Sequence, residues 1–156
     1  MAKEIERKFL VKPRDFDALA KGVEIRQGYL ASSPTLSVRV RIYGDKGFVT
    51  IKGATKGASR DEYEYEIPLD DAREILDRLS EVKPIDKIRY RIPLSGHVWE
   101  VDRFRGDNEG LVVAEVELKS ENESVEIPDW IDREVTGDPR YYNSNLSRHP
   151  FRTWNQ

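Results

Sequence analysis

In seven separate segments of the sequence, charged or polar side chains alternate with apolar ones, residue by residue. A period of two is typical of a β-strand whose two faces meet different surroundings. The seven segments are 4–11, 36–43, 47–52, 61–68, 85–93, 97–104 and 111–119, and a shorter run at 25–30 is a candidate eighth. Turn-like pieces such as 44–47 separate them and suit hairpins. The pattern predicts an antiparallel sheet, and closure into a barrel leaves no edge strand unpaired.

Helical patterns are few and short. The clearest covers residues 70–79, with Asp70 as its expected N-cap and one apolar stripe made of Ala72, Ile75, Leu76 and Leu79. Residues 14–21 and 128–135 are two further candidates, and the tail at 147–156 has no clear pattern. The expected fold class is α+β, mainly antiparallel β, as a single domain over 1–156 with a few short helices outside an eight-stranded barrel.

The charged residues of these segments fall on one face of each strand. In chain order that face carries Glu4, Glu6 and Lys8; Arg39 and Arg41; Lys52; Glu62, Glu64 and Glu66; Lys87, Arg89 and Arg91; Glu100 and Asp102; and Glu115, Glu117 and Lys119. One interpretation is that each charged face is simply wetted by solvent, which is common in antiparallel sheets. However, like charges at i and i+2 are about 6.6 Å apart and repel each other. Because this repulsion recurs on several strands, a binding role for the charged faces is favoured over simple solvation.

A closed sheet with the charged faces inward would surround one lumen with both signs of charge. Clustered carboxylates hold divalent cations, and clustered arginine and lysine side chains hold a polyanion. A polyphosphate with bound metal ions uses both halves at once, because its terminal oxygens suit the guanidinium groups of Arg39, Arg41 and Arg89. This hypothesis makes the barrel lumen the candidate site.

Composition excludes several other kinds of site. The chain has no cysteine and only two histidines, so a metal site has to use oxygen ligands, which favours Mg²⁺ or Mn²⁺ over zinc or copper. Residues 53–57 lack the Gly-Lys-Ser/Thr ending of a phosphate loop, and no Gly-x-Gly-x-x-Gly occurs. A net charge of −3 gives no overall attraction for nucleic acid or an anionic membrane. The start of the sequence is charged rather than apolar, and we expect a cytoplasmic protein, monomeric or homodimeric.

Two motifs near the N-terminus point to a known family. These are the Glu-x-Glu-x-Lys of residues 4–8 and the Gln-Gly-Tyr of residues 27–29. Further matching segments follow in the same order at 38–41, 50–52, 60–64, 87–90, 100–102, 114–117, 134–136 and 140–143. Together they cover nearly the whole chain. The sequence therefore resembles the CYTH family of triphosphate tunnel enzymes, and its short bacterial members most of all.

The resemblance implies a closed barrel of eight antiparallel strands whose charged lumen binds a triphosphate and two divalent ions. By position it makes the metal ligands Glu4, Glu6, Asp102, Glu115 and Glu117. It makes the phosphate clamp Arg39, Arg41, Lys52, Lys87 and Arg89, with Arg60 as a weaker member. Lys8 and Tyr29 occupy the positions that orient or deprotonate the attacking water, and Lys8 would also contact phosphate. From the residues alone, Tyr29 could equally be a strand aromatic, and Lys8 could form a salt bridge to Glu4 or Glu6.

The implied activity is metal-dependent hydrolysis of a triphosphate, with inorganic tripolyphosphate as the first candidate substrate and ATP or another nucleoside triphosphate as the next. The same family contains adenylyl cyclases and thiamine triphosphatases, and these stay open as alternatives. A third alternative is a module that binds polyphosphate or nucleotide without turnover. Release of phosphate from tripolyphosphate separates the enzyme from the module.

Overall fold

The computed structural model describes residues 3–154, which form nine strands and two α-helices together with four single-turn 3₁₀ helices. The strands are β1 (Lys3–Val11), β2 (Val23–Ser32), β3 (Leu36–Tyr43), β4 (Lys46–Gly53), β5 (Ser59–Ile67), β6 (Ile85–Leu94), β7 (His97–Phe104), β8 (Val112–Glu117) and β9 (Ile131–Glu134). The helices are α1 (Leu69–Arg78), α2 (Asn143–Arg148), η1 (Phe16–Ala18), η2 (Gly106–Asn108), η3 (Pro139–Tyr141) and η4 (Phe151–Thr153). Each of the eight strand segments expected from the sequence is present.

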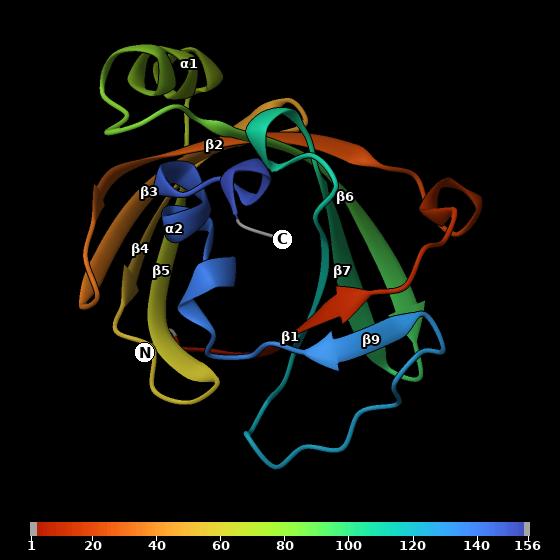
Figure 1. Ribbon diagram of the computed structural model, residues 1–156. Coiled ribbons are helices and arrows are strands. Elements are labelled where there is room, and N and C mark those ends of the chain that lie inside the picture. The colour runs from red at the N-terminus through yellow and green to blue at the C-terminus, as the bar shows by residue number, and fades with distance from the viewer. Residues whose placement is uncertain (1–2, 155–156) are drawn as a thin grey trace.

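Eight of these strands close into an antiparallel barrel. Their order is β5-β4-β3-β2-β6-β7-β8-β1, and β1 closes the ring by pairing with β5, with Ile5 opposite Ser59. The second half of β1 leaves β5 and pairs with β8 on one side and β9 on the other. Figure 1 shows the ring of strands, with α1 outside it and α2 within its outline. The closed barrel is confirmed, whereas α2 is not one of the expected outer helices.

The segment expected as a third helix is a strand. Ile131–Glu134 forms β9 and pairs with the end of β1, where Val11 lies opposite Ile131. Ile131 and Val135 are both buried, and a spacing of four residues fits either a helical or a strand period. The unpaired backbone groups at the end of β1 decide between the two, because a buried strand edge has to be hydrogen bonded.

The other two predicted helices are present as helical segments, but their lengths or ends differ from the prediction. Residues 14–21 contain only the single turn η1, whose Phe16 packs edge-on against Trp130 with ring centroids 5.2 Å apart. Helix α1 starts at Leu69 after Pro68, so Asp70 lies in its first turn and is not its cap. Ala72 and Leu76 are buried as expected, but Leu79 is 61% exposed because the helix ends before it.

The largest apolar core lies outside the barrel wall. The outward side chains of β1, β6, β7 and β8 pack beneath η1 and the segment before β9, in a cluster that includes Phe9, Tyr90, Trp99 and Trp130. A second outer cluster joins Val40 of β3 to Ala72 and Leu76 of α1. Helix α1 approaches the wall closely, since a Cβ added at Gly28 would lie 2.9 Å from a Leu76 methyl carbon. Placing the core outside leaves the lumen free for polar side chains.

The inner face of the wall changes from charged to apolar along the strands. Beyond Lys8, Glu115 and Asp102, the inward positions on the same strands are Leu10, Val113 and Phe104. These residues form a third core with Val135, Tyr141 and Leu146 of the C-terminal segment. The segment therefore fills one part of the barrel, and the charged part stays open.

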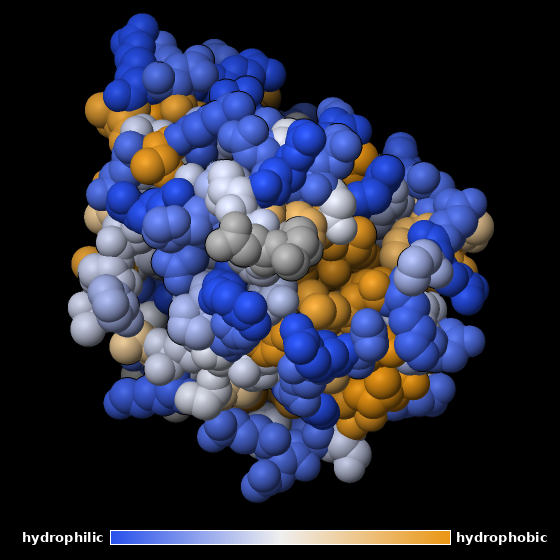
Figure 2. All heavy atoms as spheres, in the orientation of Figure 1, coloured by the Kyte–Doolittle hydropathy of each residue, from blue (hydrophilic) through white to orange (hydrophobic). Residues whose placement is uncertain are grey.

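The surface is mostly polar. Figure 2 shows hydrophilic side chains over most of the visible face, with hydrophobic atoms gathered near its middle. Within residues 3–154, no helix combines the length and the apolar character that crossing a membrane requires.

Candidate functional site

The charged inner faces surround a cavity of about 510 Å³. Eleven of the thirteen residues predicted for the site line it: Glu4, Glu6, Lys8, Tyr29, Arg39, Arg41, Lys52, Arg60, Arg89, Glu115 and Glu117. The other two, Lys87 and Asp102, lie on the same inner face but do not line the cavity, because they are almost fully buried beside the C-terminal segment. The inward orientation of the charged faces is what distinguishes this barrel from a sheet wetted by solvent.

Carboxylates gather where β1 meets β8. Glu6 lies opposite Glu117, and Lys8 lies opposite Glu115, in the antiparallel register. Glu6 and Glu115 share a hydrogen bond between their carboxyl groups. Burial and the neighbouring carboxylates Glu115 and Glu4 raise the pKa of Glu6 well above its usual range. Glu6 therefore carries the shared proton.

The same wall holds more negative charge than its cations balance. Burial would raise the pKa of Glu115, but the Lys8 ammonium and the hydrogen bond from Glu6 hold it below the usual range. Burial, followed by repulsion from Glu4 and Glu100, raises the pKa of Glu117. Such raised values show carboxylates that lack a positive partner, and a divalent cation supplies one. The donor set consists of oxygens, which suits Mg²⁺ or Mn²⁺.

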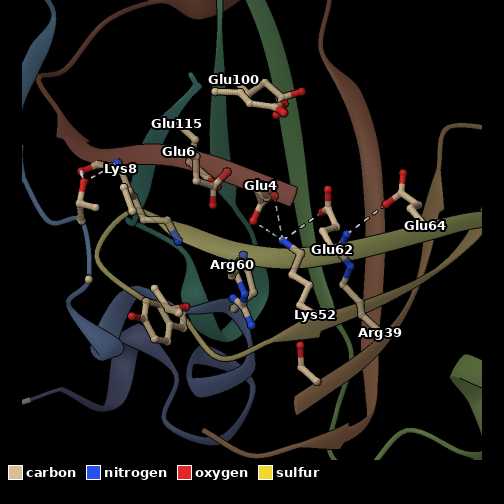
Figure 3. A pocket seen from close by; sticks show the side chains of 18 of the residues that line it. Glu4, Glu6, Lys8, Arg39, Lys52, Arg60, Glu62, Glu64, Glu100 and Glu115 are labelled. Atoms are coloured by element: carbon tan, nitrogen blue, oxygen red, sulfur yellow. Dashed lines mark hydrogen bonds and ion pairs between the residues drawn. The ribbon is translucent and has the colours of Figure 1, made fainter. Parts of the chain in front are cut away.

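The described carboxylates do not form a complete metal-binding site as they stand. Among residues 3–154, no three acidic or histidine side chains converge closely enough to hold a cation as they stand. One reason is Lys52, whose Nζ lies 3.2 Å from each carboxylate oxygen of Glu4 and 3.4 Å from Oε2 of Glu62. Figure 3 shows Lys52 between these two side chains. A bound cation would take the place of this ammonium beside Glu4.

The opposite wall is basic. Arg39 and Arg41 each place Nη2 3.5 Å from Oε2 of Glu64, and Thr50 donates a 2.7 Å hydrogen bond to the same oxygen. Figure 3 shows Arg39 turned toward Glu64. Burial, together with repulsion from Arg39 and Arg89, lowers the pKa of Arg41 to about 10. The Nε atoms of Arg39 and Arg41 are buried without a hydrogen-bond partner among the described residues. Arg39 and Arg41 therefore share one carboxylate as their ion-pair partner.

Asp102 lies in a buried ion network on the inner face of the barrel. Its Oδ1 accepts a 2.8 Å hydrogen bond from Nε of Arg89, and its Oδ2 lies 2.7 Å from Nζ of Lys87. Burial would raise the pKa of Asp102, but Arg89 and Lys87 lower it to about 2. Burial lowers the pKa of Lys87 to about 8. The structure thus pairs Asp102 with two cations, and the Glu115 carboxylate is near enough to oppose the lowering of its pKa.

Arg89 connects this network to the cavity. Its Nη1 lies 3.3 Å from Oε1 of Glu100, which also contacts Arg91. Arg60 is turned differently, since it donates from Nε and Nη2 to the carbonyl oxygen of Gly53. Arg89 is therefore held in place by Asp102, and Arg60 is held at the β4–β5 turn.

Lys8 is fixed by the C-terminal segment. Its Nζ donates a 3.0 Å hydrogen bond to the carbonyl oxygen of Tyr141, and its backbone groups bond to Val135 and Thr136. Burial would lower the pKa of Lys8, but Glu115 and Glu6 raise it above its usual value. Lys8 is therefore a charged ammonium and poorly suited to be a general base. Figure 3 shows Lys8 and Glu6 on the same side of the lumen.

Several lining residues were not among the predicted site residues. Glu62, Glu64 and Glu100 line the cavity, and all three lie on charged faces that the sequence pattern had already picked out. Tyr142, Asn143 and Ser144 of the C-terminal segment also line it. The family resemblance includes residues 140–143 but gave them no role, and their inward position depends on how this segment packs in the barrel.

Comparison with known proteins bears on this geometry directly. The family model of the CYTH domain matches residues 2–143. The chain belongs to the CYTH family. A relative named inorganic triphosphatase, from Acetivibrio thermocellus, is 54% identical over 156 residues, which is all of both chains. A second relative with this name, from Nitrosomonas europaea, is 38% identical over 92% of this chain and 96% of its own length.

Solved structures of CYTH relatives have the same fold. One described as an inorganic triphosphatase is 34% identical, with a TM-score of 0.66 over 92% of this chain and 96% of its own. A conserved hypothetical protein from Pyrococcus furiosus is 25% identical, with a TM-score of 0.58 over 76% of this chain and 80% of its own. The fold is thus shared with a protein named an inorganic triphosphatase.

Proposed function

We propose that the protein is a divalent-metal-dependent inorganic triphosphatase that hydrolyses tripolyphosphate inside the barrel lumen. The observation that carries the proposal is the pair of opposed walls, one on which carboxylates crowd one another and one on which Arg39 and Arg41 share a single carboxylate. A polyanion that brings its own metal ions satisfies both. The name and the full-length similarity of the Acetivibrio thermocellus relative support the same reaction.

The proposed metal ligands are Glu4, Glu6, Glu115 and Glu117, and we expect two ions of Mg²⁺ or Mn²⁺. When bound, such ions neutralise phosphate charge and make the phosphorus more open to attack. To hold an ion, Glu6 would have to be deprotonated and Glu4 would have to release Lys52. Asp102 positions Arg89 through their ion pair, and Lys87 is its other partner. We assign it this positioning role in preference to direct metal binding.

The basic wall holds the phosphate chain. Arg39, Arg41 and Arg89 each present guanidinium donors to the cavity, and a guanidinium matches two phosphate oxygens at once. A triphosphate would draw Arg39 and Arg41 away from Glu64, because it carries more charge than one carboxylate. Lys52, released from Glu4, adds a further cation.

Lys8 and Tyr29 lie where the attacking water would be oriented. Lys8 remains protonated and contacts phosphate, while the Tyr29 hydroxyl contacts the water. In the reaction the water oxygen forms a bond to a terminal phosphorus as the bridging P–O bond breaks. The electron pair of that bond leaves with diphosphate, the water proton is released, and the products are diphosphate and phosphate.

A substrate panel tests the proposal. Tripolyphosphate, ATP and thiamine triphosphate are each incubated with the protein and Mg²⁺ or Mn²⁺, and the products are identified by ³¹P NMR. We expect diphosphate and phosphate from tripolyphosphate at the highest kcat/KM. Tight binding of tripolyphosphate without product would contradict an enzyme, and cyclic nucleotide from ATP would identify a cyclase.

A further inference from the structure

The C-terminal segment contributes side chains to the cavity as well as packing in the barrel. Leu146 of α2 is fully buried in the inner apolar core. Asn143, the first residue of α2, instead lines the cavity beside Tyr142 and Ser144. The segment thus anchors itself through one side chain and presents others to the lumen.

The orientation of the Asn143 amide is set by a buried lysine. Nζ of Lys87 donates to Oδ1 of Asn143 at 3.4 Å. An ammonium group can only donate hydrogen bonds, so the amide oxygen has to face it. Lys87 itself cannot turn away, because its side chain is fully buried, it lies 2.7 Å from Asp102, and it packs over the ring of Phe104. The oxygen of Asn143 is therefore held toward the barrel wall.

The amide nitrogen of Asn143 is turned the other way and is unused. Within the part of the chain that the structure describes, Nδ2 has no hydrogen-bond partner, although the neighbouring Asn145 donates from its own Nδ2 to the carbonyl oxygen of Pro139 at 2.6 Å. Asn143 is half-buried, and the nitrogen is not sealed off from the cavity that the residue lines. Two N–H donors are thus available to a ligand there.

We propose that Asn143 is a further substrate-binding residue, whose Nδ2 donates a hydrogen bond to a phosphate oxygen of the bound triphosphate. This inference rests on the proposed function of the lumen. An uncharged donor suits this end of the cavity, because Lys8 and Arg89 already line it and a further cation would add to their repulsion. The C-terminal segment then helps to define which anion fits.

The test uses two variants of this residue and one control in the same segment. Asn143→Ala removes the donor, and Asn143→Asp replaces it with an anion that still satisfies Lys87 and so keeps the fold. Asn145→Ala removes the bond to Pro139 without altering a lining residue. With tripolyphosphate as substrate, we expect about a tenfold lower kcat/KM for Asn143→Ala, as for one lost hydrogen bond, and a larger loss for Asn143→Asp. Asn145→Ala stays within about twofold of wild type, since its lost bond does not touch substrate.

Thermal unfolding checks that all three variants fold, and calorimetric titration with tripolyphosphate separates binding from turnover. Unchanged kcat/KM in Asn143→Asp would overturn the inference, and so would an equal loss in Asn145→Ala, which would mean that the segment acts only by packing. If wild type binds tripolyphosphate without hydrolysing it, the proposed function fails, but weaker binding by Asn143→Ala still supports the inference. If wild type does not bind it at all, both fail.

Discussion

Glu6 donates its carboxyl proton to the Glu115 carboxylate across the pairing of β1 with β8. Two neighbouring carboxylates repel each other, so the protonated form of Glu6 is favoured beside Glu115. A divalent cation offers the same pair a different partner. Metal binding and proton release are therefore linked at this position.

The first prediction follows from that link. Binding of Mg²⁺ or Mn²⁺ should release protons from wild type, because the ion favours the deprotonated form of Glu6, whose pKa is raised without it. Calorimetric titration in two buffers with different ionisation enthalpies measures the proton release. The Glu6→Gln variant has no such proton and should release less while binding the ion more weakly. Equal proton release by both proteins would place the metal elsewhere.

The second prediction concerns the position of Asp102. Asp102→Asn leaves Lys87 and Arg89 buried without their carboxylate, which typically costs about 3–5 kcal/mol. Glu117→Gln is the matched control, since Glu117 is crowded by like charges and its loss should leave stability unchanged or higher. Urea unfolding without metal measures both. If Asp102→Asn is as stable as Glu117→Gln, Asp102 behaves as a metal ligand and the positioning role is wrong.

Comparison of wild type with Asp102→Asn also gives a pH dependence. The pKa of Asp102 is lowered to about 2 in the folded protein. An unfolded aspartate titrates near pH 4, so the stabilising contribution is complete above about pH 5 and is lost as the pH falls toward 2. The free energy of unfolding of wild type should therefore fall more steeply over this range than that of Asp102→Asn. Parallel curves would contradict the buried ion network.

A further prediction tests the basic wall. Arg39→Ala and Arg41→Ala should each lower kcat/KM for tripolyphosphate about 10- to 100-fold, because each removes charged hydrogen bonds to phosphate. Arg41→Lys keeps the charge but loses the planar guanidinium that can bond two phosphate oxygens at once, so it should recover only part of the activity. Steady-state kinetics over a range of substrate concentrations separates the two effects. Wild-type kinetics in these variants would place the side chains outside the substrate contacts.

Tyr29 and Lys8 should differ in their kinetic signatures. Tyr29→Phe should lower kcat by about 10²-fold with little change in KM, since the hydroxyl contacts the water rather than the phosphates. Lys8→Met should lower kcat and raise KM, because the ammonium contacts phosphate. The pKa of Lys8 is raised, so its charge should not limit the rate between pH 7 and about 9. Full kcat in Tyr29→Phe would leave that residue as a strand aromatic.

Much of the site could be predicted from the period of two along the strands. Alternation alone puts Glu4, Glu6 and Lys8 on one face, and the structure turns that face inward. It also put Glu62 and Glu64 on an inner face, although the family resemblance gave them no role. Alternation predicts the face of each side chain because pairing with neighbouring strands fixes the register.

Features that depend on distant partners could not be predicted in this way. Glu100 and Asp102 share a face, yet one lines the cavity and the other is buried with Lys87 and Arg89. How deep each lies depends on the C-terminal segment, whose packing the sequence does not indicate. The strand β9 is a similar case, because the open edge of β1 decides it and local propensity does not.

The central claim is that the acidic wall serves metal-dependent hydrolysis of a triphosphate, and its most direct test is phosphate release from tripolyphosphate with and without divalent metal. Wild type is compared with the double variant Glu6→Gln/Glu117→Gln, and thermal unfolding confirms that both are folded. We expect release by wild type only with Mg²⁺ or Mn²⁺, and none above background by the variant under any condition. Release without metal, or wild-type rates in the folded variant, would contradict the account.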